Sequence, residues 1–191
     1  MLAPVRTVAP AITPVSLAEA KQHLRVDHSD DDALITALIA AAVDHLDGWT
    51  GILGRCLVEQ TWRQDFERFA SCLPLPLGPV IGIVSVMSDA GSVDQASYSL
   101  VTDAGGRARV EFASGVSVAG PVSVTYEAGY PTTPEQPGSP VVPEKSTVPD
   151  GLKLAIVLHV KMNYETMEPA ARDSYQRAFD ALIAPYRRIS V

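Results

Sequence analysis

Two helices are predicted near the N-terminus. Ser16 and Glu19 form an S-x-x-E capping box, which predicts a short helix from Leu17 to Leu24. After a second cap at Ser29 and the aspartates beside it, apolar residues recur at helical spacing and predict a helix that ends at Gly48 or Gly51. Its predicted buried stripe consists of Leu34, Ile35, Leu38, Ile39, Ala42, Leu46 and Trp49.

Two more helices are predicted near the C-terminus. The segment from Asp150 to Thr166 is apolar on nearly every side, which is typical of a central, buried helix. Pro169 suits the first turn of a last helix, and Pro185 limits that helix near residue 184. Because neither pair of helices looks complete without the other, we expect all of them to pack into one bundle.

The middle of the chain changes to the period of β-strands. Val58, Trp62 and Phe66 share one face of a predicted strand, with polar residues on the other face. The nearly continuous apolar run from Val80 to Met87 is predicted to be a buried strand. Further strands are predicted at Tyr98–Val101, Ala108–Phe112 and Val122–Tyr126, and residues 73–79 are predicted to be a proline-punctuated connector.

These elements predict an α+β fold. We expect a bundle of about four helices, two N-terminal and two C-terminal, with a small antiparallel β unit inserted between the second and the third. Residues 1–15 hold several prolines and no apolar period, so they are predicted to be an extended arm that is mobile unless a partner holds it. The expected organisation is a single domain over 1–191, with a helical bundle at 16–51 and 150–186, an inserted β unit at 55–130 and an exposed Pro-rich loop at 131–149.

The composition is that of an ordinary globular protein. The chain has 191 residues, 47% of them hydrophobic and 19% charged, and this length allows a sizeable core without a metal or a disulfide. No apolar run approaches the roughly 18 residues of a membrane span, and no signal-peptide pattern stands at the N-terminus, so no membrane partner is expected. A net charge of −7 argues against a dedicated duplex-DNA binder, whose affinity comes mainly from cations.

No constellation of residues in the sequence indicates catalysis or metal binding. Cys56 and Cys72 lack the spacing of zinc ligands and are interpreted as reduced thiols, and a disulfide between them stands as the alternative. The acidic run from Asp27 to Asp32 lacks the glycine and the glutamate that an EF-hand loop requires. No HExxH motif or His/Cys cluster includes the histidines, which are His23, His28, His45 and His159. We therefore predict no enzymatic activity, no catalytic residue, no metal and no cofactor.

Charge is unevenly distributed along the chain. The segment from Asp27 to Asp47 contains six aspartates and no Lys or Arg, whereas residues 172–191 contain four arginines and two aspartates. These segments are either two solvated faces or the complementary faces of a head-to-tail contact between subunits. The residues predicted to make such inter-subunit charge contacts are Asp30, Asp31, Asp32, Asp44, Asp47, Arg172 and Arg177.

Six segments stand in a fixed order along residues 14–188. They are TPVSLAEAKQHLRVDHSDDDALITALIAAA, LVEQTW, LPLPLGPV, VTYEAGY, VPDGLKLAIVLHVKMNYE and LIAPYRR. Together they resemble the head-to-tail connector (adaptor) proteins of long-tailed phages and of phage-like gene transfer agents. The resemblance implies a structural virion protein that works in the neck, at the head-tail interface, after synthesis in the bacterial cytoplasm.

The resemblance also implies partners. Such adaptors form a ring of copies, dodecameric on the portal protein, which extends the DNA channel and docks the stopper or tail-completion protein. DNA passes through the channel without specific binding. In these adaptors the C-terminal segment contacts the portal, which implies a docking role here for Tyr186, Arg187, Arg188, Ile189 and Val191.

Two alternatives stand beside this interpretation. One is a small α+β ligand-binding protein or enzyme, with a site between bundle and β unit lined by Trp49, Trp62, Tyr126 and His159. It requires a pocket of several hundred Å³ with convergent polar groups. The other is a different neck protein, such as a stopper or tail-completion factor, which binds the head in a different order.

Overall fold

The computed structural model describes residues 1–134 and 145–188. Its described part is a mixed α+β structure that divides into two compact units. The β unit comprises Met1–Ala11 and Val58–Pro131, and the helical unit comprises Ile12–Leu57 and the chain from Thr132 onward.

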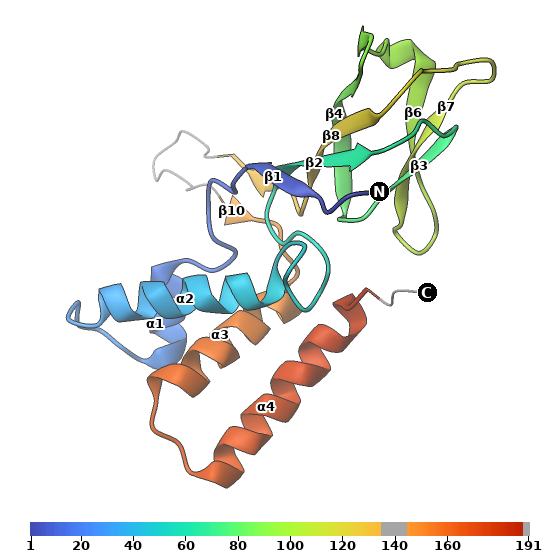
Figure 1. Ribbon diagram of the computed structural model, residues 1–191. Helices are drawn as coiled ribbons and strands as arrows, with labels where there is room; N and C mark the ends of the chain where they lie inside the picture. The colour runs from blue at the N-terminus through green and yellow to red at the C-terminus, as the bar shows by residue number, and fades with distance from the viewer. Residues whose placement is uncertain (135–144, 189–191) are drawn as a thin grey trace. The chain divides into compact units, whose positions relative to one another are not determined.

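The helical unit is built around its third helix. Its helices are α1 (Leu17–Leu24), α2 (Asp32–Leu46), α3 (Asp150–Tyr164) and α4 (Pro169–Ile183). Helix α3 contacts α1, α2 and α4, and Figure 1 shows it lying between α2 and α4. Its buried positions are Leu152, Ala155, Ile156, Val157, Val160 and Met162, because three helices cover it. The predicted burial is wrong at Leu154, which is 41% exposed.

The two predicted N-terminal caps differ in outcome. The capping box of α1 is confirmed, because the Glu19 N–H donates to Ser16 Oγ at 3.2 Å and the Ser16 N–H donates to the Glu19 carboxylate at 2.8 Å. The prediction that a side chain caps α2 is wrong. The N-cap residue of α2 is Asp31, and its side chain makes no hydrogen bond to the first turn of the helix. Asp31 instead accepts a hydrogen bond of 2.6 Å from the Tyr164 hydroxyl at the end of α3.

The predicted apolar stripe of α2 is correct in its centre and wrong at its ends. The buried residues are Ile35, Ile39, Ala42 and Leu46, which follow one another at intervals of three or four. Leu34 lies one position off this stripe and is 51% exposed. Trp49 is 46% exposed because the helix ends at Leu46, before the stripe would reach it.

A tight loop over residues 47–57 follows α2 and returns to it. The Asp47 carboxylate accepts a hydrogen bond of 2.6 Å from the Leu57 N–H, and the Ile52 N–H donates to the His45 carbonyl at 2.9 Å. Gly51 lies so close to the end of α2 that a Cβ there would overlap backbone atoms of Leu46 and Asp47. The loop therefore depends on a residue without a side chain at this position.

A five-stranded antiparallel sheet forms the larger part of the β unit. Its order is β1 (Val5–Val8), β2 (Gln60–Phe66), β8 (Val122–Ala128), β4 (Val80–Ser88) and β5 (Gly91–Ser92). The predicted mobility of the N-terminal arm is wrong for its middle, because residues 5–8 pair with β2 and form an edge of this sheet. The backbone hydrogen bonds of β2 hold the arm, and a hydrophobic period is not required for that.

The centre of this sheet has one buried face. Trp62 lies directly opposite Tyr126 across β2 and β8, and Phe66 lies opposite Val122. These side chains alternate with half-buried or exposed polar residues, as predicted for this strand pair. Strand β4 departs from its prediction as a buried strand, since Val86 is its only buried residue and Ile81, Val84 and Met87 are 39%, 55% and 44% exposed.

A second antiparallel sheet completes the β unit. It contains β3 (Cys72–Leu75), β7 (Ala108–Phe112) and β6 (Tyr98–Thr102) in that order, and the short 3₁₀-helix η1 (Gln95–Ser97) precedes β6. The predicted connector at 73–79 is wrong at its start, which belongs to β3. Leu73 and Leu75 are buried there, whereas Cys72 and Pro74 are exposed.

The segment predicted as a Pro-rich loop is described only at its ends. There, β9 (Thr132–Thr133) pairs antiparallel with β10 (Lys145–Ser146), and both strands belong to the helical unit. Residues 135–144, which carry most of the predicted loop, lie outside the described residues.

Substituting Gly51→Ala is expected to destabilise the helical unit by about 1–3 kcal/mol, because the added methyl group meets the backbone and not a side chain that can move. The matched control is Gly151→Ala in α3, where a Cβ would lie 3.7 Å from the nearest atom. We expect the control to be neutral or slightly stabilising. Urea unfolding followed by helical circular dichroism measures both, and equal stabilities would contradict the close approach at Gly51.

Candidate functional site

The C-terminal segment of the helical unit folds back onto the loop over residues 47–57. Helix α4 is followed by the short 3₁₀-helix η2 (Ala184–Tyr186). The Arg188 N–H then donates a hydrogen bond of 3.1 Å to the Leu53 carbonyl, and Leu53 itself is buried. This bond fixes the path of the chain as it leaves the last helix.

Tyr186 anchors the same segment. The guanidinium carbon of Arg55 lies 5.9 Å from the centre of the Tyr186 ring, at the outer limit of a cation–π contact. A Cβ on Gly151, in the first turn of α3, would lie 3.7 Å from the Tyr186 hydroxyl. The tyrosine ring is therefore held between the loop and the start of α3.

The predicted docking residues thus divide into three groups. Tyr186 and Arg188 are half-buried and held by the helical unit, whereas Arg187 between them is exposed. Ile189 and Val191 lie outside the described residues.

The structure adds two exposed apolar residues that the sequence interpretation did not assign to a surface. Trp49 is 46% exposed and Ile52 is 37% exposed, and both belong to the loop that holds the C-terminal segment. We call Trp49, Ile52 and Arg187 the C-terminal surface. The glycines flanking Trp49 were the available clue, since ending the helix at Gly48 leaves the indole in a turn.

Three of the predicted contact aspartates are engaged inside the helical unit. Asp47 is 8% exposed and accepts the Leu57 N–H, so it is a structural residue of the loop. Asp31 accepts the Tyr164 hydroxyl, and Asp32 pairs with the Lys21 ammonium group. These bonds tie the start of α2 to α1 and α3.

The remaining predicted contact residues present charge to solvent. The Asp30 side chain is 90% exposed, and Asp44 is exposed on α2. Arg177 is exposed on α4 and donates to Ser174 Oγ at 3.1 Å. Arg172 is exposed as a residue, but one of its Nη1 protons is donated to the Met162 carbonyl at 2.9 Å.

Two histidines form a ring stack in the helical unit. The imidazole of His45 stacks on that of His159 with 5.4 Å between ring centroids, and the buried Phe179 lies 5.7 Å from His159. Burial lowers the pKa of His159, and the nearby charges of His45 and Arg172 lower it further. No nucleophile contacts this pair in the described structure.

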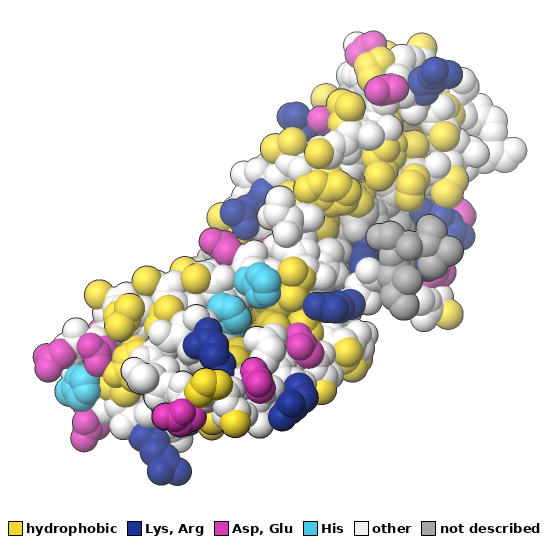
Figure 2. Space-filling view, turned by 60° about the horizontal axis from the view of Figure 1, so that its bottom comes forward, with side chains coloured by type: hydrophobic (Ala, Val, Ile, Leu, Met, Phe, Trp, Pro, Cys, Tyr) yellow, Lys and Arg dark blue, Asp and Glu magenta, His cyan; other side chains and the backbone are white. Residues whose placement is uncertain are grey.

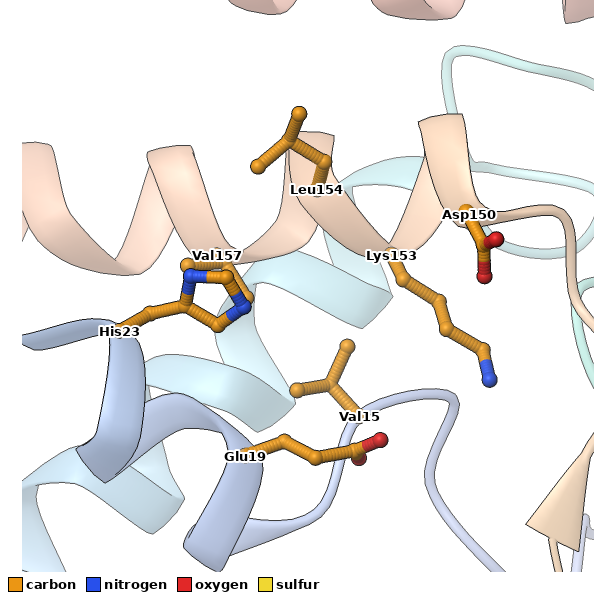
Figure 3. A pocket seen from close by; sticks show the side chains of 7 residues that line it. All are labelled: Val15, Glu19, His23, Asp150, Lys153, Leu154 and Val157. Atoms are coloured by element: carbon orange, nitrogen blue, oxygen red, sulfur yellow. The ribbon is translucent and has the colours of Figure 1, made fainter.

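A cavity of about 300 Å³ opens between α1 and α3. Figure 3 shows the side chains that line it: Glu19 and His23 belong to α1, and Lys153, Leu154 and Val157 belong to α3. Burial raises the pKa of Glu19, but hydrogen bonds from Ser16 and the charges of Lys153 and Lys145 outweigh burial and leave the pKa below its usual range.

Two of the charged groups of this cavity, Glu19 and Lys153, already have partners in the fold. Glu19 accepts the Ser16 N–H and hydroxyl, and Lys153 Nζ donates to the Ser146 carbonyl at 2.9 Å. A ligand would have to compete with these bonds, so the cavity does not favour the ligand-binding alternative.

The residues named for that alternative have other roles. Trp62 and Tyr126 are buried in the sheet core, Trp49 is exposed, and His159 stacks on His45. Among the described residues, no three His, Cys, Asp or Glu side chains form a group that could hold a metal ion. No helix in the described part of the chain has the length and apolar character needed to cross a lipid bilayer.

The first part of the chain is similar to a known family. Residues 14–67, which contain α1, α2 and β2, match the model of the Phage gp6-like head-tail connector protein family. No curated protein matches the chain.

Two solved structures contain chains of similar fold. A chain in "Virion of native gene transfer agent (GTA) particle" is 21% identical with a TM-score of 0.72, and the match covers 100% of this chain and 97% of that one. A chain in "Neck of empty GTA particle computed with C6 symmetry" is 23% identical with a TM-score of 0.74 and the same coverage. The resemblance inferred from the sequence is confirmed, by the connector family over residues 14–67 and by the fold over the whole chain.

Acidification is expected to destabilise the helical unit through His159. Because the pKa of His159 is lower in the folded than in the unfolded chain, the unfolded chain binds more protons as the pH falls below about 6.5. The contribution of His159 to the free energy of unfolding is complete above that pH. It is lost as the pH falls toward the pKa of His159 in the folded chain. Urea unfolding at a series of pH values from 8 to 5 measures the loss.

The matched variant is His159→Gln, which keeps a polar side chain but does not titrate. Its stability at pH 8 measures the effect of the changed packing alone. Between pH 7 and 5 the variant should lose less stability than the parent protein, and the difference measures the effect of protonating His159. Identical pH profiles for the two proteins would show that His159 does not carry this dependence.

Proposed function

We propose that this protein is a structural head-tail connector, or adaptor, in the neck of a phage-like particle or gene transfer agent. The observation that carries the proposal is the whole-length likeness in fold to a chain in the neck of a GTA particle. The match of residues 14–67 to the connector family supports the same assignment independently of the fold. The alternative of an enzyme or ligand-binding protein has no comparable support.

The physical character of the chain supports a structural role. A channel wall that guides DNA should not hold its phosphates, and a chain of net charge −7 has little affinity for them. We propose that copies form a ring on the portal protein, extend its DNA channel and present the next surface to a stopper or tail-completion protein. In this ring the β unit, residues 55–130, acts as an insertion into the bundle formed by residues 16–51 and 150–186, and the two work as a single domain.

The C-terminal surface is the proposed portal contact. It combines an exposed aromatic ring at Trp49, an exposed aliphatic side chain at Ile52 and an exposed cation at Arg187. Aromatic residues and arginine are the types most enriched among the energetically dominant residues of protein interfaces. Because Tyr186 and Arg188 hold the segment against the helical unit, the surface is largely preorganised for binding.

The exposed charges are proposed to guide contact between neighbouring copies. Asp30 and Asp44 on one copy would face Arg177 on the next, since these side chains present their charge to solvent. Asp31, Asp32 and Asp47 are left out of this set because they are engaged within their own unit.

Saturation binding to tail-less, DNA-filled heads that carry their portal tests the function. We expect the purified protein to bind at the portal vertex and to saturate near a dozen copies per head, the number that the resemblance to dodecameric adaptor rings implies; a closed ring has a fixed number of places. Quantitative mass spectrometry of isolated heads counts the bound copies, and labelled protein seen by electron microscopy locates them. Absence of binding at that vertex would overturn the adaptor assignment.

Variants of the C-terminal surface test the portal contact. Trp49→Ala and Arg187→Glu are each expected to weaken head binding by more than about fivefold, since loss of a central interface residue costs more than about 1 kcal/mol. Arg107→Glu is the matched control, because Arg107 is an exposed arginine of the β unit. If all three variants bind like the parent protein, the portal contact lies elsewhere.

Charge reversal tests the contact between copies. The double variant Asp30→Lys/Asp44→Lys is expected to weaken assembly on heads by about 2- to 5-fold per contact, as for exposed ion pairs worth up to about 1 kcal/mol. Adding Arg177→Glu to the same chain should restore assembly. Reversal without effect, or without restoration, would remove these residues from the contact.

A further inference from the structure

The five-stranded sheet of the β unit has two open edges. Strand β1 ends the sheet on one side, and in the described part of the chain no strand pairs with its outer edge. On the other side, β5 pairs with Met87 and Ser88 of β4, and the Val93 N–H donates to the Val86 carbonyl at 2.9 Å. The backbone of residues 80–85 therefore forms a second open edge, with unpaired N–H and C=O groups like any edge strand.

Both edges carry exposed apolar side chains. Val5 and Val8 on β1 are 47% and 57% exposed, and Ile81 and Val84 on β4 are 39% and 55% exposed. A Cβ on Gly82, between the two β4 residues, would meet no atom within 4 Å, so the space directly beside this residue is open. Hydrophobic side chains are visible on the face of the β unit shown in Figure 2.

The β4 edge is free of two devices that commonly protect exposed edges. Residues 80–85 contain no charged residue and no proline, although shifts of register against β8 at Ile81 and Val84 make this stretch irregular. An open backbone edge with apolar side chains is complementary to another open strand, because only a strand satisfies the row of backbone groups as well as the side chains.

The directions of the strands determine which pairing fits. β1 is antiparallel to β2, β2 to β8, and β8 to β4. Strand β4 therefore runs opposite to β1. When a second copy is placed beside the first with its sheet continuing in the same order, its β1 lies antiparallel to β4 of the first copy. The all-antiparallel ladder of the sheet then continues across the contact.

We infer that β1 of one copy pairs antiparallel with residues 80–85 of β4 in the next copy. The two edges lie on opposite sides of one sheet, so the contact is head-to-tail and leaves a further edge at each end of a dimer. This inference deepens the proposed function, because it names a surface through which the copies of the ring would contact one another. Since β1 has only four residues, we expect the contact to be weak between free chains and strengthened when other contacts hold the copies together.

Chemical crosslinking of the full-length protein in solution tests the pairing. The background variant is Cys72→Ser, which removes the exposed thiol and leaves the buried Cys56. Val8→Cys and Val84→Cys are introduced separately, and the two proteins carry tags of different mass. They are mixed at about 1 mM, where a contact with a millimolar Kd is substantially populated. A bismaleimide spanning about 8 Å reaches diagonal neighbours on paired strands and tolerates a small shift in register.

A head-to-tail contact predicts a specific product. The amount of the mixed Val8→Cys/Val84→Cys crosslinked dimer should exceed that of either homodimer by about tenfold or more. In the proposed contact β1 pairs with β4, so two β1 edges or two β4 edges do not come together. Adding Ile81→Lys to the Val84→Cys protein should reduce the mixed dimer strongly, since it places a charge on the apolar edge. Thermal unfolding monitors whether each variant keeps the stability of its parent, as substitutions at these exposed positions should allow.

The matched control is Ser99→Cys, an exposed position on β6 at the edge of the second sheet. A mixed dimer no more abundant than the statistical proportion, equal crosslinking with Ser99→Cys, or no dimer would each overturn the pairing. The result is independent of head binding. Specific crosslinking without head binding would leave the edge contact and reject the connector role, and the reverse result would retain the connector and reject this contact.

Discussion

The helical unit depends on the burial of α3 by helices from both ends of its chain. Helices α1 and α2 reach α3 across the whole β unit in sequence, and the hydrogen bond from Tyr164 to Asp31 joins residues 133 positions apart. Such packing requires the intervening chain to leave and return at nearly the same point. The β unit meets this requirement, because Val58 at its entry forms a bridge with Tyr130 at its exit. Because the β unit begins and ends at neighbouring residues, the helices before it and after it can pack against one another.

The acidic residues near α2 show how one feature of composition serves two purposes. Asp31, Asp32 and Asp47 form bonds to a hydroxyl, an ammonium group and a backbone N–H, and these bonds hold α2 at both ends. Neighbouring aspartates such as Asp30 keep their charge in solvent, where it acts over several ångströms on approaching partners. Only the first group contributes directional bonds to stability, and only the second is available for contact with another molecule. The proposed ring contacts use that second group.

Local patterns predicted much of the fold. The capping box at Ser16, the buried centre of α2 and the alternation of the β2–β8 pair were all readable from sequence, because each is set by neighbours within a few residues. Strand β1 was not readable, since four residues without a hydrophobic period gain their structure from β2, more than fifty residues away. The exposure of Ile81 and Val84 was missed for the same reason. An apolar run does not reveal whether another strand covers it.

The candidate site follows the same division. The sequence by itself determined the residue types, the acidic and basic segments, the order of helices and strands, and the resemblance to connector proteins, because these depend on composition, period and motif order. The tertiary structure alone decided that Asp47 is buried, that Trp49 is exposed and that Arg188 is bonded to the loop after α2. Exposure and partnership depend on which distant segments pack together. That packing results from the whole chain burying its apolar surface at once, and no local stretch of sequence specifies it.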